Sequence, residues 1–246
     1  MKTKYPVLMF MICLCYLFAG CATDNGKHTV EKDGKDMTIL KNEAVPDLKW
    51  VFSKLANLYF TMSEVTVSQY EKCVRVGVCE SKHYEIKLVN NDCNWGYSDR
   101  GNHPMNCVDL HGAYTFCQWV GGRLPLEYEW FAEASNNNSR DYPWGNEIAT
   151  CNYTVMSEMS YGEGGCGKGS TWPVCGKSPG NSVSGLCDMS GNVGEWTWSQ
   201  RDHSYVVCGA SWDSHMQDSL RASFHFQRLP DVCDFHIGFR CVKSNT

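Results

Sequence analysis

The cysteine content constrains this chain more than any other feature. The sequence has 246 residues and 15 cysteines, of which Cys13, Cys15 and Cys21 belong to the N-terminal segment. The twelve others form an even number and stand singly along the chain, a pattern typical of disulfides in an exported protein. Metal clusters are the alternative, but no Cys-x-x-Cys follows Cys21, which disfavours zinc. We therefore expect a disulfide framework that compensates for sparse regular structure at about 2–4 kcal/mol per bridge.

The N-terminus has the pattern of a processed targeting segment. Two lysines precede an apolar run over 5–18, which is shorter than the roughly 20 residues of a bilayer span. Leu-Phe-Ala-Gly before Cys21 resembles a bacterial lipobox, in which that cysteine is acylated and becomes the mature N-terminus. An ordinary signal peptide cleaved elsewhere is the alternative. Acyl chains would anchor the protein to a membrane. By resemblance to enterobacterial sorting, Ala22 favours an outer membrane lipoprotein that faces the periplasm or the surface.

The remainder is organised as one domain behind a tether. We assign 1–20 to a lipoprotein signal peptide, 21–47 to a polar tether poor in aromatics, and 48–246 to the folded domain. With 43% apolar residues, the chain can bury one substantial core. The net charge of −5 comes without a basic stripe, so nucleic acid is not an expected partner.

Regular elements are expected to be few. A β-prone run over 65–67 precedes a helix over 68–77 whose first residue is a serine. Asp109 can cap a second helix over 110–120, and a third helix covers 126–134. The C-terminal half is rich in Gly, Ser, Asn and Pro, which predicts loops with short strands. The apolar spacing of the second helix predicts a buried face made by Leu110, Ala113, Tyr114, Cys117 and Val120.

Several motif-like segments follow one another along the domain. They are Ser63–Tyr70 (SEVTVSQY), His103–Val108 (HPMNCV), Gly121–Trp130 (GGRLPLEYEW), Tyr142–Asn146 (YPWGN), Gly185–Trp198 (GLCDMSGNVGEWTW), Gly209–Trp212 (GASW) and Ile237–Cys241 (IGFRC). Any one of them is a weak signal, but in this order they resemble the formylglycine-generating enzyme (sulfatase-modifying factor) family. The resemblance implies an irregular α+β fold with C-type-lectin-like topology, rich in loops and stabilised by disulfides and calcium.

The resemblance also implies disulfides and calcium ligands. It pairs Cys117 with Cys241, and Cys73 and Cys79 are near enough in sequence to pair across a helix end. The oxygens of four residues align with a calcium site of the family, and such hard donors suit Ca²⁺. The alternative is a hydrogen-bonded turn with a glutamate in a salt bridge. These four residues are Asp188, Gly191, Val193 and Glu195.

A second calcium site is less well supported by the sequence. It would use Asn152 and the carbonyl of Tyr153. The aspartate that completes this site in the family falls near Cys166, where no carboxylate stands.

The resemblance breaks down at the reactive centre. In the family, a catalytic cysteine pair follows the Gly-Gly-Ser-aromatic turn by a few residues. The segment 212–222 holds no thiol in any alignment, so we assign no catalytic residue and expect no copper site. At Cys208 and Cys233, the nearest cysteines, we expect structural disulfides rather than a relocated redox pair. Leu126 replaces a helix-capping threonine, and Gly194 replaces a bulky aromatic residue.

Polar residues after the turn are candidates for a binding groove within 212–228. A Ser-His-Asp triad among Asp213, Ser214, His215 and Asp218 is disfavoured, because triad residues converge from distant segments. We expect a surface groove with the candidate residues Trp212, Ser214, His215, Arg221 and His225.

The leading hypothesis for function is a binding module. The chain would be a lipid-anchored exported protein whose formylglycine-generating-enzyme-like domain binds a protein or a glycan at the cell envelope without catalysis. The first alternative is an oxidoreductase of the same family, performing sulfatase-maturation-like or other metal-dependent oxidation with a different residue set. The second alternative is an envelope lipoprotein with a purely structural role.

Overall fold

The computed structural model describes residues 46–81, 92–159 and 162–245. The expected signal peptide, Cys21 and nearly all of the expected tether lie outside these residues. Among the helices that are described, none is long and apolar enough to cross a membrane.

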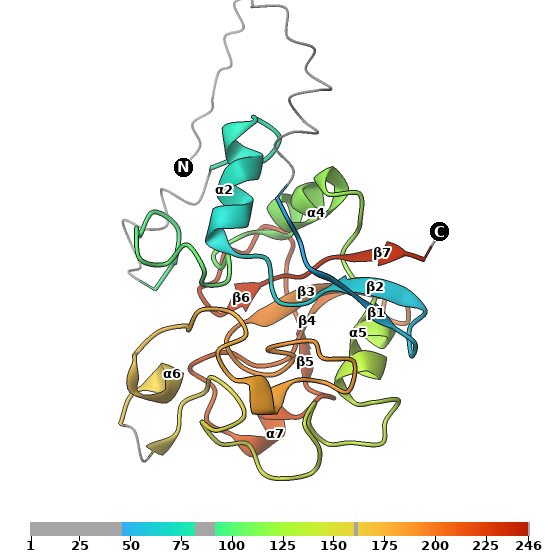
Figure 1. The fold of residues 1–246 in the computed structure, drawn as a ribbon, viewed down its shortest axis with the longest axis vertical. Helices are drawn as coiled ribbons and strands as arrows, with labels where there is room; N and C mark the ends of the chain where they lie inside the picture. The colour runs from blue at the N-terminus through green and yellow to red at the C-terminus, as the bar shows by residue number, and fades with distance from the viewer. Residues whose placement is uncertain (1–45, 82–91, 160–161, 246) are drawn as a thin grey trace, which may run out of the picture. The chain divides into compact units, whose positions relative to one another are not determined.

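Two small sheets organise the domain (Figure 1). The first has the order β1-β2-β7 and is antiparallel; it joins β1 (Trp50–Ser53) and β2 (Leu58–Thr61) to β7 (Val242–Ser244). The start and the end of the described domain therefore pair with each other. The second sheet has the order β5-β4-β3-β6, and β6 alone runs parallel to its neighbour. Its strands are β3 (Gly194–Ser199), β4 (Ser204–Cys208), β5 (His225–Gln227) and β6 (Ile237–Gly238).

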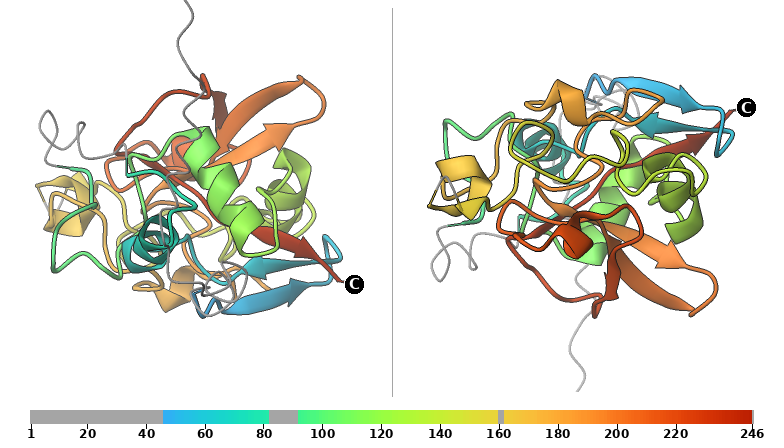
Figure 2. Two further views of the ribbon diagram at one scale, coloured as in Figure 1. Left: turned by 90° about the horizontal axis from the view of Figure 1, so that it is seen from above. Right: turned by 90° about the horizontal axis from the view of Figure 1, so that it is seen from below.

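Two helices lie between the β1–β2 and β3–β4 hairpins, as both views in Figure 2 show. They are α4 (Leu110–Trp119) and α5 (Glu127–Ala134), and α5 packs on β3 and β4. A third helix, α2 (Val67–Arg75), packs against α4. The remaining helical turns are short: α6 (Gly164–Gly167), η2 (Ser178–Gly180) and α7 (Gln217–Leu220). The expected loop-rich α+β fold is confirmed.

Helix α2 begins one residue earlier than the serine suggested. Its N-cap is Thr66, whose hydroxyl accepts from the Gln69 N–H at 3.3 Å, while Gln69 Oε1 accepts from the Thr66 N–H at 2.9 Å. This reciprocal capping box satisfies two of the otherwise unpaired donors at the helix start. The β-prone run is a single bridge, between Thr66 and Pro104, rather than a strand.

Helix α4 begins as predicted, with the Asp109 carboxylate accepting from the Gly112 N–H at 2.7 Å. One residue of its expected buried face is wrong, because Tyr114 is 52% exposed. Phe116 is buried in its place, stacked on Tyr70 and edge-on to Phe239.

Helix α5 keeps half of its expected capping box. Leu126 has no hydroxyl to offer, but Glu129 Oε2 still accepts from the Leu126 N–H at 2.8 Å. Arg123 holds the same carboxylate through two bonds of 2.7 Å.

Five disulfides are formed among the described cysteines. The longest in sequence joins Cys117 in α4 to Cys241, the pair that the family resemblance implies. The others are Cys73–Cys79, Cys93–Cys107, Cys151–Cys166 and Cys175–Cys187. The expectation of a structural disulfide at Cys208 is wrong, because Cys208 is a buried thiol. Cys233 is half-buried and lies outside these five bridges.

Candidate functional site

A buried ion pair lies at the centre of the domain. Glu195 on β3 accepts from the Arg240 guanidinium at 2.6 and 2.7 Å, and its Oε2 also accepts from the Trp130 indole N–H at 2.8 Å. Arg240 donates further to the carbonyl of Cys187 at 2.8 Å. The salt bridge that was the alternative role for Glu195 is therefore formed, and it ties β3 to α5 and to the C-terminal segment.

Two more carboxylates share this buried space. Glu64 is 1% exposed and Asp188 is 8% exposed, and both lie near Glu195 and Arg240. Burial raises the pKa of Glu64 well above its usual range, and the neighbouring carboxylates raise it further. Burial also raises the pKa of Asp188. Three carboxylates thus face one guanidinium. Glu64 Oε1 accepts from the Asn192 side-chain amide at 3.1 Å, while Oε2 is buried with no hydrogen-bond partner among the described residues.

The expected calcium ligands fit this space in part. In the described chain, no hydrogen bond ends on the carbonyl oxygen of Gly191 or Val193, although both residues are buried. Buried carbonyls need a partner, and a divalent cation would satisfy them and balance the excess charge. Glu195 is occupied by Arg240, and within the described chain no three acidic, histidine or cysteine side chains converge on a metal position. Residues that could hold Ca²⁺ are therefore Asp188 and Glu64 with these two carbonyls.

Glu64 was missed as a candidate by sequence reasoning. It stands in the Ser-Glu-Val-Thr segment, whose residue pattern carries no signal of a metal ligand.

The second expected calcium set stays a prediction. Asn152 is exposed, and the Tyr153 carbonyl packs directly on Gly180, where a Cβ would lie 1.8 Å from it. The two segments that would share the ion are joined by the Cys151–Cys166 disulfide instead. The Glu158 carboxylate lies beside this disulfide, accepting from the Cys151 backbone N–H at 2.7 Å.

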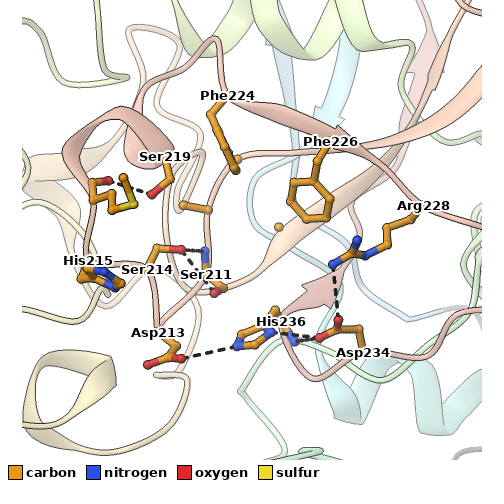
Figure 3. Close-up of a pocket in the computed structure, with 14 residues that line it drawn as sticks. Ser211, Asp213, Ser214, His215, Ser219, Phe224, Phe226, Arg228, Asp234 and His236 are labelled. Carbon is orange, nitrogen blue, oxygen red and sulfur yellow. Dashed lines mark hydrogen bonds and ion pairs between the residues drawn. The ribbon is translucent and has the colours of Figure 1, made fainter.

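A cavity of about 280 Å³ lies beside β3, at the end of β4 and along β5 (Figure 3). We call it the β5 pocket. Its wall is built by the loop after β4, by one face of the chain around β5, and by the segment before β6. Its lining residues are Gly194, Gly209, Ala210, Ser211, Asp213, Ser214, His215, Met216, Ser219, Phe224, Phe226, Arg228, Asp234 and His236.

Four charged or titratable groups form a row along the β5 pocket, as the dashed lines in Figure 3 show. His236 Nδ1 lies 3.0 Å from Asp234 Oδ1, and the backbone N–H of His236 donates to the same oxygen at 2.9 Å. The outer contacts are longer: His236 Nε2 to Asp213 is 3.8 Å, and Asp234 to Arg228 is 4.0 Å. The hydrogen bond from the His236 side chain lowers the pKa of Asp234, which keeps this carboxyl ionised.

Two of the five expected groove residues line the β5 pocket. Ser214 and His215 do so, whereas Trp212 is buried and is not among the lining residues, and its backbone N–H donates to the Asn192 carbonyl. Arg221 points to Asp141 and Asp218 at 2.7 and 3.1 Å. His225 faces Glu127 at 3.6 Å on the other side of β5.

The residues that sequence reasoning missed follow a readable pattern in part. Phe226 lies in β5, and Phe224 and Arg228 flank it at a spacing of two, which places every second side chain on one face of an extended segment. Asp234 and His236 carried no such signal, because the fold brings them to the pocket from the segment before β6.

The β5 pocket presents hydroxyls where the family resemblance places thiols. Ser214 and Ser219 line it, both within the segment expected to hold the cysteine pair. The buried thiol of Cys208 lies 3.3 Å from Thr197 Oγ1, and burial raises its pKa, so it is a poor nucleophile. Gly194, in place of a bulky aromatic, also lines the pocket, and a Cβ at this position would lie 2.7 Å from the Val207 side chain on β4.

Comparisons with known proteins identify the family of this chain. The family model described as "Sulfatase-modifying factor enzyme 1-like domain" matches residues 26–245. The chain is 33% identical over 161 residues to inactive C-alpha-formylglycine-generating enzyme 2 of Bos taurus, covering 61% of this chain and 53% of that protein. It is 31% identical over 180 residues to the formylglycine-generating enzyme of Mycobacterium tuberculosis, covering 60% and 59%. The chain thus spans little more than half the length of these relatives.

A solved structure shares the fold. PvdO from Pseudomonas aeruginosa superposes with a TM-score of 0.59 at 17% identity, covering 76% of this chain and 80% of that one. Because the family model covers residues 26–245, the chain belongs to the sulfatase-modifying factor family.

Proposed function

We propose that this protein is a non-catalytic binding module and that the β5 pocket is its ligand site. The main supporting observation is that Ser214 and Ser219 line the β5 pocket, within the segment where the family resemblance expects thiols. A serine hydroxyl is a hard, weakly acidic donor that does not replace a thiolate as a copper(I) ligand. The bovine relative is itself named as inactive, which supports a non-catalytic role for this chain.

The proposal includes export and lipid anchoring. Support comes from the lipobox-like segment ending at Cys21 and from a framework of five disulfides, which form in oxidising compartments. The protein would be held at the bacterial outer membrane by acyl chains on Cys21. Metabolic labelling with a fatty acid should mark the wild type and leave Cys21→Ala unlabelled. Labelling of neither protein would contradict the anchor.

Calcium is proposed as a structural ion. It would be held by Asp188, Glu64 and the carbonyls of Gly191 and Val193, and it would supply positive charge to a space with excess buried carboxylates. No copper is proposed.

The test of the binding role has two arms. Purified protein should neither convert the cysteine of a sulfatase-motif peptide to an aldehyde nor bind Cu(I) tightly, and turnover would favour the oxidoreductase alternative. Panels of peptides and of glycans should then yield a ligand whose binding is lost in Ser219→Trp, which places an indole against the pocket. Asp231→Asn, an exposed position outside the pocket lining, is the matched control. Binding that is indifferent to Ser219→Trp would contradict the β5 pocket as the site.

A further inference from the structure

The charges of the β5 pocket are unequally satisfied. Asp234 receives two short contacts from His236 and a longer one from Arg228. Among the described residues, the polar contact of the Asp213 carboxylate is to His236 at 3.8 Å, which is too long for a hydrogen bond. The Asp213 side chain is also 55% exposed. The carboxylate of Asp213 therefore keeps its hydrogen-bonding capacity for a ligand.

The opposite wall of the β5 pocket is aromatic. Figure 3 shows Phe224 and Phe226 on one side and Asp213 with His236 on the other. The guanidinium of Arg228 already lies 4.7 Å from the centroid of Phe226, so this ring accepts a cation over its face. Met216, at the pocket wall, is 60% exposed and offers an apolar contact.

The size of the pocket limits what can enter. A cavity of about 280 Å³ lies just below the range of about 300–1,000 Å³ typical of pockets for drug-sized ligands. It therefore suits one side chain or a group of similar size. An alkyl stem can contact the aromatic wall while its charged end reaches the carboxylate, as lysine and arginine side chains do on apolar surfaces.

We propose that the β5 pocket binds a basic side chain, a lysine or arginine of an exported protein partner, with Asp213 as the anion that recognises it. This inference rests on the proposed binding function. The chain carries a net charge of −5, which favours encounter with a basic partner. A free carboxylate facing aromatic rings also disfavours an anionic ligand, because it would place like charges together.

The probes are short peptides that are identical except for one central residue: lysine, arginine, Nε-acetyl-lysine or glutamine. Titration calorimetry should show the lysine and arginine peptides binding and the other two binding at least about tenfold more weakly, as expected for loss of one charge-assisted contact. Asp213→Asn should weaken lysine-peptide binding by a similar factor. Asp231→Asn should leave it unchanged, and Arg228→Gln should strengthen it, because it removes a like charge from the pocket wall. Thermal unfolding of each variant checks that it is folded.

Equal binding of the lysine and acetyl-lysine peptides, or binding unaffected by Asp213→Asn, would overturn the inference. If such binding were still lost in Ser219→Trp, the pocket would remain a ligand site and only the cationic ligand would be wrong. Binding of glucosamine but not of N-acetylglucosamine, with no basic peptide bound, would overturn the protein source. If no probe bound, and a ligand from the peptide or glycan panels bound the wild type and Ser219→Trp equally well, the proposed function would be overturned as well.

Discussion

Arg240 faces three carboxylates in a space closed to solvent, and this imbalance decides how the region responds to protons and cations. Glu195 is paired by two short bonds, so its charge is compensated. Glu64 and Asp188 are the excess, and burial raises the pKa of both. Without a bound cation, the Glu64–Asp188 pair is expected to hold a proton in the folded protein. In the unfolded chain, the same carboxyl groups release their protons near their ordinary pKa values. With Ca²⁺ bound, both carboxylates would be ionised.

The first prediction is that calcium stabilises the protein through Glu64. In the presence of a chelator, the free energy of unfolding should fall as pH rises. A carboxyl group whose pKa is higher in the folded than in the unfolded state contributes its full stability below the unfolded pKa. That contribution is lost as pH rises through the folded pKa. Saturating Ca²⁺ should raise the melting temperature at pH 7.5 by about 5–10 °C, the shift for a ligand at about a hundredfold its Kd. Glu64→Gln should remove most of this increment and flatten the pH dependence in chelator.

The matched control for calcium is Glu133→Gln. Glu133 is also fully buried, but it accepts hydrogen bonds from Ser182 and Ser184 away from the arginine. Its substitution should leave the calcium increment intact. A wild-type melting temperature that ignores both calcium and chelator, measured by differential scanning calorimetry, would count against the site.

At the scale of the element, local chemistry decides where helices begin, and packing decides which face is buried. Asp109 could be identified from the sequence because an acidic cap precedes a clear apolar period. Ser68 was the wrong start for α2, since Thr66 makes the reciprocal bond with Gln69. Tyr114 was misplaced because spacing alone leaves the edge of an apolar face undefined. Phe116 takes that place by contacting Tyr70 and Phe239, which lie far away in sequence.

The second prediction concerns the start of α2. Thr66→Ala removes the hydroxyl that accepts from Gln69 and should reduce the free energy of unfolding by about 0.5–2 kcal/mol, measured by denaturant titration. Ser68→Ala is the control, because the structure assigns the cap to Thr66 and Ser68 lies inside the helix. Equal losses in the two variants would mean that the capping box does not set the stability of this helix.

At the scale of the whole molecule, long-range contacts were predictable only where a motif carried them. The family resemblance supplied the Cys117–Cys241 bridge, and nearness in sequence suggested Cys73–Cys79. The other three pairings, and the meeting of Asp213, Arg228 and His236 in the β5 pocket, depend on how loops cross between the sheets. Loops with little regular structure carry no period from which such crossings can be inferred. The sequence therefore predicted the segment that contains the proposed ligand site, but not the row of charged residues that lines it.

The third prediction compares two bridges that differ mainly in loop length. Cys117–Cys241 spans 124 residues and Cys73–Cys79 spans 6, and all four cysteines are buried. In the chain-entropy model, a longer closed loop removes more freedom from the unfolded chain. Replacing the long bridge by two alanines should therefore lower the free energy of unfolding by about 2–3 kcal/mol more than replacing the short one.

Two features of the fold bear on the size of that difference. Cys151–Cys166 and Cys175–Cys187 lie inside the long loop and shorten its effective length, which reduces the entropy that the bridge removes. In the opposite direction, Cys241 adjoins Arg240 and β7, so losing the bridge also loosens the pairing of the chain ends. Urea unfolding of both double-alanine variants under oxidising conditions measures the two effects together. A smaller loss for the long bridge than for the short one would show that residual structure in the unfolded chain, rather than loop length, sets the contribution of each disulfide.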